Sequence, residues 1–84
     1  MGKREELLKR ILSGAADANI RFDDLTSLLV SLGFDQRIRG SHHIFRKSGI
    51  QEKINLQRDG NNANPYQVRQ VRGVIVRYKL AGEI

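Results

Sequence analysis

The spacing of apolar residues changes its period twice along this chain, and that pattern limits the possible folds more than any other feature. Up to Gly33 the apolar residues recur at the intervals of an amphipathic helix. Between Phe34 and Gln57 apolar and polar residues tend to alternate, which predicts strands. Helical spacing returns after Asn64. The pattern therefore predicts helices at both ends of a β-meander.

The predicted helices cover residues 3–13, about 22–32, and the segment from Pro65 onward. Gly33 is suited to the left-handed cap that ends the second helix, with Phe34 folding back as in a Schellman motif. Asn64 is a good N-cap for the third helix, and Pro65 suits its first position. Gln67 stands at the spacing of a capping box.

The predicted strands cover residues 34–39, 43–47 and 52–57. Gly40-Ser41 is a two-residue turn signal between the first two, and residues 59–63 are a loop by composition. A meander with one apolar face must cover that face with helices. We therefore expect a single domain over residues 1–84 with an α+β, two-layer fold. It has a three-stranded antiparallel sheet covered by helices (α-β-β-β-α), with residues 3–13 as an additional N-terminal helix.

Positive charge is concentrated in the second part of the chain. Fifteen Lys and Arg against nine Asp and Glu give a formal charge of +6. The segment up to Gly33 is balanced, so the whole excess follows it. A phosphate-bearing partner is attracted to such a surface, although basic residues also serve simply to keep a protein soluble. On charge alone, nucleic acid and a solvated surface stay open.

The composition argues against several other classes of protein. There is no cysteine, which removes disulfides, thiolate catalysis and the usual structural zinc sites, and which fits a reducing compartment such as the cytoplasm. No apolar run approaches the length that crosses a bilayer. We therefore expect no membrane association and no metal or small-molecule cofactor.

The two histidines, His42 and His43, are adjacent in the second strand, so their side chains point to opposite faces of the sheet and cannot jointly chelate a metal. If Phe45 packs inward, His43 goes inward with it and His42 points outward with Ile44. The opposite register would expose the aromatic ring, and it is disfavoured for that reason. The outer face then also carries four cations and two amides, namely Arg37, Arg39, Arg46, Lys53, Asn55 and Gln57.

An exposed imidazole beside cations suits RNA cleavage. Histidine can deprotonate a ribose 2′-hydroxyl, which attacks the adjacent phosphate while Arg or Lys stabilises the growing negative charge. The plainer interpretation is that His42 is an ordinary residue beside a hairpin turn. His43 is more typical of a histidine packed at the core or sheet edge.

The segment from about residue 20 to residue 80 resembles the HicA family of toxins. The marker is Gly40-Ser41-His42, which follows a helix ending in Gly33-Phe34 and precedes the strand His43-Ile44-Phe45. Residues 65–72, Pro-Tyr-Gln-Val-Arg-Gln-Val-Arg, look like one branch of that family.

The resemblance implies a double-stranded-RNA-binding-like fold. It also implies an mRNA-cleaving endoribonuclease that blocks translation and is held inactive by a HicB-type antitoxin. The catalytic histidine of the family corresponds to His42, and Gly40 and Ser41 form the turn that presents it. Two features depart from the family. The helix over residues 3–13 is additional to its minimal core, and Gln57-Arg58 stands where many members have a proline-histidine segment.

Two further functions compete with the ribonuclease. One is a non-catalytic module that binds RNA or DNA, and the other is a protein-interaction domain with a basic face for an acidic partner. In either nucleic-acid function, we expect the strand cations together with two arginines of the last helix to contact the ligand. These candidate contact residues are Arg37, Arg39, Arg46, Lys53, Arg69 and Arg72.

Overall fold

The helices and strands follow one another in the order that the periods predict, with four short additional elements among the described residues. In this computed structural model, residues 3–83 are described. The helices are α1 (Lys3–Ser13), α2 (Phe22–Ser31) and α3 (Pro65–Arg77), with short 3₁₀ helices η1 (Asp17–Asn19) and η2 (Leu80–Glu83). The strands are β1 (Asp35–Arg39), β2 (His42–Arg46), β3 (Ile54–Leu56), β4 (Arg58–Asp59) and β5 (Asn62–Ala63).

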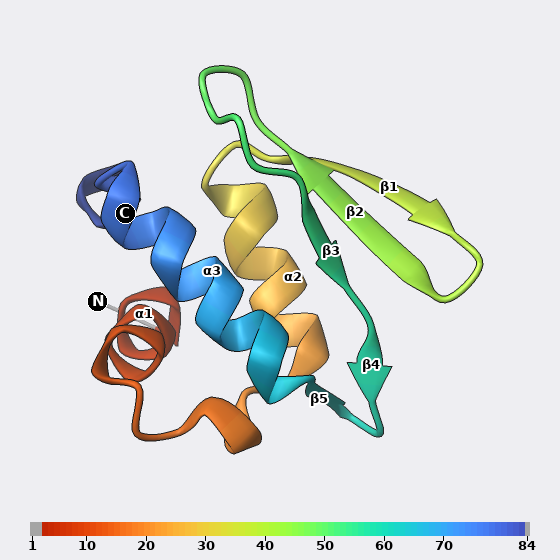
Figure 1. Cartoon of the computed structure of the whole chain (residues 1–84). Coiled ribbons are helices and arrows are strands. Elements are labelled where there is room, and N and C mark those ends of the chain that lie inside the picture. The colour runs from red at the N-terminus through yellow and green to blue at the C-terminus, as the bar shows by residue number, and fades with distance from the viewer. Residues whose placement is uncertain (1–2, 84) are drawn as a thin grey trace.

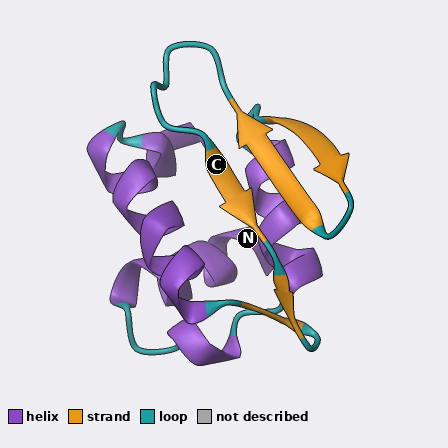
Figure 2. Cartoon of the chain, turned by 45° about the vertical axis from the view of Figure 1, so that its right-hand side comes forward, coloured by secondary structure: helices purple, strands orange, loops and turns teal. Residues whose placement is uncertain are grey.

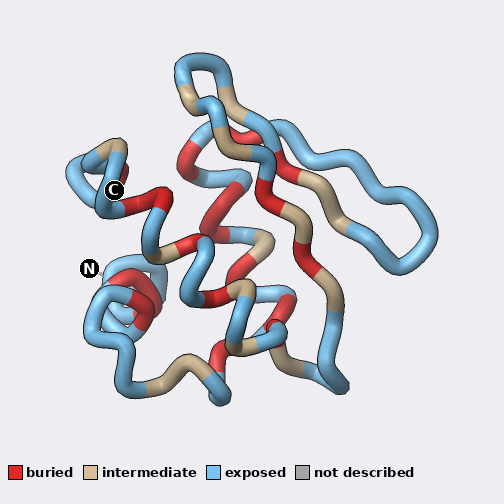
Figure 3. The backbone as a smooth tube through the Cα atoms, viewed as in Figure 1, coloured by how far each residue is buried: buried red, intermediate tan, exposed pale blue. Residues whose placement is uncertain are grey.

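A three-stranded antiparallel sheet in the order β1-β2-β3 forms one layer, and helices form the other (Figures 1 and 2). This arrangement confirms the predicted two-layer α+β fold at that level of description. The β1–β2 hairpin extends away from the helices (Figure 1). Every residue of β1 is exposed, and burial is concentrated along α2, α3 and β3 (Figure 3). The hairpin therefore extends from the body of the protein into solvent.

The end of α2 follows the predicted Schellman geometry. Gly33 has a φ of 97°, and its N–H donates to the Val30 carbonyl at 3.0 Å. The Phe34 N–H donates to the Leu29 carbonyl at 3.1 Å, and the Phe34 side chain is buried. This left-handed cap turns the chain from α2 directly into β1.

The start of α3 differs from the prediction in one contact. Asn64 caps the helix as expected, because its Oδ1 accepts from the Tyr66 N–H at 2.9 Å. Gln67, however, makes no capping box. Its Oε1 accepts a hydrogen bond from the Gln57 N–H at 2.8 Å instead. Gln67 therefore links the first turn of α3 to the backbone just after β3.

The segment 59–63, predicted as a loop, contains all but the first residue of a small hairpin. β4 pairs with β5 through Arg58↔Ala63 and Asp59↔Asn62, and Gly60-Asn61 forms the turn. Ala63 is fully buried, and its N–H donates to the Ile20 carbonyl at 2.8 Å. The prediction was wrong because composition signals the turn but not such short flanking strands.

The core lies between the sheet and all three helices. Phe45, Ile54 and Leu56 point inward from the sheet and are fully buried. On α1, Ile11 is equally buried, so this additional helix is an integral part of the hydrophobic core. The chain is therefore one packed unit around one core, with the outer face of the sheet left uncovered.

Candidate active site on the outer face of the sheet

The register of the sheet decides which side chains share the outer face. Arg39 lies opposite His42, and Arg37 lies opposite Ile44, so these four side chains point to the same side. Asn55 also lies opposite Ile44 on the other flank. Phe45 is fully buried on the inner side, as expected. The sheet therefore has the register that leaves His42 in solvent.

Four cations surround Ile44 on this face. A shallow hollow is lined by Asp35, Arg37, Arg39, Ile44, Arg46 and Lys53. Within residues 3–83, none of the side chains of Arg37, Arg39, Arg46 and Lys53 makes an ion pair or a hydrogen bond. We call these four residues the cationic sheet face. Asp35 is the single acidic group in the hollow, so its net charge is positive.

His42 stands at the edge of the cationic sheet face. Its Nδ1 lies 3.2 Å from Oδ1 of Asn55. Because the amide oxygen can only accept, this contact is a hydrogen bond when Nδ1 carries the proton, and Nε2 then keeps its lone pair. Nε2 has no hydrogen-bond partner among the described residues. Such an imidazole has a free basic nitrogen open to solvent.

The turn before His42 is tightly defined. Gly40 and Ser41 separate the paired residues Arg39 and His42, as predicted. Gly40 has a φ of 58° and Ser41 does not enter the positive region, which is the pattern of a type II′ hairpin turn. The Ser41 hydroxyl accepts a hydrogen bond from Gln57 Nε2 at 3.4 Å. Arg39 and His42 are thus held opposite each other, with their Cα atoms about 5 Å apart.

His43 has quite different surroundings. Its ring packs edge-on against Phe22, with the centroids 4.8 Å apart and the planes at 78°. Its Nδ1 is hydrogen-bonded to Gln36 Nε2 at 2.9 Å. The guanidinium of Arg58 also lies over the Phe22 ring, 4.5 Å from its centroid. His43 is therefore a packed histidine at the inner edge of the sheet, and the two imidazoles do not meet.

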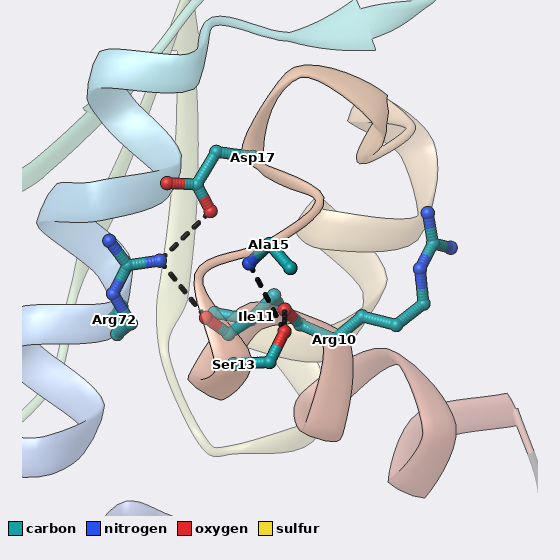
Figure 4. A network of polar contacts seen from close by, with 6 residues as sticks. All are labelled: Arg10, Ile11, Ser13, Ala15, Asp17 and Arg72. Atoms are coloured by element: carbon teal, nitrogen blue, oxygen red, sulfur yellow. Dashed lines mark hydrogen bonds and ion pairs between the residues drawn. The ribbon is translucent and has the colours of Figure 1, made fainter.

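The two arginines predicted to join the site from α3 are placed elsewhere. Arg72 is only 23% exposed, and its Nη1 donates to the Ile11 carbonyl at 3.1 Å and to Asp17 at 2.8 Å (Figure 4). Arg72 joins α3 to the segment after α1, so it is not grouped with the other candidate contact residues. Arg69 is exposed, and its guanidinium lies 5.8 Å from the ring centroid of Tyr66.

The alternation of the third strand predicts that Asn55 and Gln57 lie on this face, and the resemblance puts Gln57, with Arg58, where a family segment could contact the substrate. The contacts of Asn55 with His42 and of Gln57 with Ser41 are seen only in the structure. Tyr66 was missed, although an aromatic residue outside the apolar arc of a helix is a usable signal.

No group of three His, Asp or Glu side chains within residues 3–83 is arranged to hold a metal ion. None of the helices in that range combines the length and apolar character needed to span a bilayer. Comparisons of the chain with models of protein families, with curated proteins and with solved structures found no match. The assignment of a function rests on the site itself.

Proposed function

We propose that this protein is an endoribonuclease that cleaves mRNA with His42 as its general base, and that it acts as the toxin of a HicA–HicB-type toxin–antitoxin pair. The observation that carries the proposal is the exposed imidazole of His42, whose Nε2 is free beside the cationic sheet face. The resemblance of Gly40-Ser41-His42 to the HicA marker supports the same assignment.

The proposed reaction needs no cofactor. Nε2 of His42 takes the proton of a ribose 2′-hydroxyl, and the resulting oxygen attacks the adjacent phosphorus. The bond from phosphorus to the 5′-oxygen breaks, water protonates that oxygen, and the products are a 2′,3′-cyclic phosphate and a 5′-hydroxyl. Arg39, which lies opposite His42, donates hydrogen bonds to the phosphate as negative charge develops. Asn55 acts as a positioning residue that orients the imidazole.

The fold and the partners are part of the same proposal. A sheet packed on helices supports a double-stranded-RNA-binding-like fold, and mRNA cleavage assigns the protein to the cytoplasm. The cationic sheet face would suit an acidic surface of a HicB-type antitoxin as well as RNA, because both carry negative charge. An antitoxin bound there would cover His42 and block cleavage.

The test is cleavage of a single-stranded RNA by the purified protein. The parent should give products that end in a 2′,3′-cyclic phosphate, and a substrate with 2′-deoxyribose throughout should survive. His42→Ala should reduce the cleavage rate about 100-fold or more, because general acid–base catalysis contributes at least that factor.

His43→Gln is the matched control, since it removes the other imidazole from the same strand. It should retain cleavage, provided that its melting temperature shows a folded protein. If His42→Ala cleaves RNA as fast as the parent does, His42 is not the base. If the parent binds RNA but releases no products, the protein is a non-catalytic binding module.

A further inference from the structure

Tyr66 is an aromatic ring that the fold itself does not use. Its side chain is 72% exposed, the largest value among the exposed large hydrophobic residues within residues 3–83. Together with Arg69 and Gln70, which lie one turn further along α3, it lines a shallow hollow. An exposed large ring that contributes nothing to the core is available to a ligand.

The ring is nevertheless held in a defined place. The Tyr66 N–H donates to the Asn64 cap at 2.9 Å, which fixes the backbone at the second position of α3. The Arg69 guanidinium lies 5.8 Å from the ring centroid, within the range of a cation–π contact. The Tyr66 hydroxyl makes no hydrogen bond with any of the described residues. A positioned ring beside a cation is the arrangement on which nucleic-acid bases stack.

The start of α3, where Tyr66 lies, is linked to the candidate active site through two hydrogen bonds of Gln57. The neighbour of Tyr66, Gln67, accepts from the Gln57 N–H at 2.8 Å. The side chain of Gln57 then donates to Ser41 at 3.4 Å, and Ser41 precedes His42. The start of α3, the end of β3 and the hairpin tip are therefore adjacent. Gln57 lies between the turn that precedes His42 and the start of α3.

We propose that Tyr66 and Arg69 form a subsite for one unpaired nucleotide of a single-stranded RNA, whose base stacks on the Tyr66 ring while Arg69 contacts a phosphate. The inference rests on the proposed function, because it extends the RNA site of His42. It also specifies the substrate, since the π-faces of bases inside a duplex are already stacked and cannot reach the ring. The hollow at Tyr66 thus selects unpaired RNA.

The experiment measures binding without turnover, in protein that carries His42→Ala. A single-stranded RNA of about ten nucleotides, with 2-aminopurine placed at each position in turn, reports stacking by the loss of its fluorescence. One position should be quenched on binding. Tyr66→Phe should keep that quenching, and Tyr66→Ala should abolish it and weaken binding about five- to hundredfold.

Val76→Ala is the matched control, because Val76 is 61% exposed on the same helix and lies outside the proposed subsite. It should bind RNA like the parent. Unchanged affinity of Tyr66→Ala for single-stranded RNA, or an equal loss for single-stranded and duplex RNA, overturns the subsite. These binding results do not depend on cleavage, so failure of the subsite is distinguished from failure of His42 as the base.

Discussion

Arg69 and Arg72 lie on adjacent turns of α3, yet their guanidinium groups have different surroundings. Arg72 bonds to Asp17, whose side chain is only 14% exposed, and to a carbonyl that is 61 residues away in the chain. Arg69 lies near the exposed ring of Tyr66 and makes no hydrogen bond or ion pair with any of the described residues. The first arginine therefore belongs to the stability of the fold, and the second is available to a ligand.

We expect Arg72→Met to lower the free energy of unfolding by about 1–3 kcal/mol, because Asp17 would lose its charged partner in a half-buried position. Arg69→Met should change stability by less than about 0.5 kcal/mol, as is usual for exposed positions, and should weaken RNA binding. Urea unfolding and RNA titration of both variants measure the two effects. Arg72→Met with parental stability would contradict the structural role of the ion pair.

The exposure of His42 could be predicted from sequence because one strong preference settles it. Because Phe45 is buried, the face to which each of the remaining side chains of its strand points is determined, and His42 points to solvent. The contacts of Arg72 and Gln67 could not be predicted in this way. Arg72 lies outside the apolar arc of α3, whereas Gln67 is a polar residue within it, and a helical period does not predict the partner of either one. Their partners, Ile11 and Gln57, belong to other parts of the chain.

Helices and strands differ in how well they can be predicted from the sequence. The three helices were predicted because each has several apolar residues in one period, and the three strands were predicted from the change of period together with turn signals such as Gly40-Ser41. The β4–β5 pair has two residues in each strand, too few for any period, and it is held by contacts such as Ala63 to Ile20. The amphipathic stripe of α1 predicted a helix, but only the structure shows that Ile11 reaches the shared core.

The end of α3 is clamped to the segment before β3 by a carboxylate. Glu52 accepts hydrogen bonds from the Tyr78 hydroxyl at 2.6 Å and from Arg77 at 3.0 Å. The hydrogen bond from Tyr78 lowers the pKa of Glu52 below its ordinary value of 4.5, and the positive charge of Arg77 lowers it further. The folded protein therefore prefers the ionised form of this group more strongly than the unfolded chain does.

Because the folded pKa of Glu52 is the lower one, its contribution to stability is present above the ordinary pKa of 4.5 and is lost as pH falls through the folded value. Glu52→Gln should melt at a lower temperature than the parent at neutral pH, and this difference should shrink in acid. Tyr78→Phe, which removes the main hydrogen-bond donor to Glu52, should also lower the melting temperature at neutral pH, and its difference from the parent should also shrink in acid. Thermal melts between neutral pH and pH 3 would contradict the clamp if the difference between Glu52→Gln and the parent stayed constant.

In the molecule as a whole, the apolar core and the unpaired cations lie on opposite faces of the sheet. The inner face of the sheet and the helices share one apolar core, whereas the outer face carries the four residues of the cationic sheet face, which have no charged partner among the described residues. Three other arginines, Arg58, Arg72 and Arg77, do form ion pairs with carboxylates. These four like charges around one isoleucine support the proposal that this face binds an anionic ligand.

Binding of RNA should therefore depend steeply on salt. If all four cations of the cationic sheet face displace counterions from a single strand, the logarithm of the affinity should fall with the logarithm of salt concentration with a slope of about −3. Replacing both Arg37 and Arg46 by Gln should reduce the slope to about half of that value, because two of the four phosphate contacts are lost. Lys9→Gln, which removes an exposed charge on α1, should leave the slope unchanged. Titrations at several salt concentrations measure these slopes. Equal slopes for the parent and the double variant would show that RNA binds to another surface, and the placement of a substrate beside His42 would then fail with it.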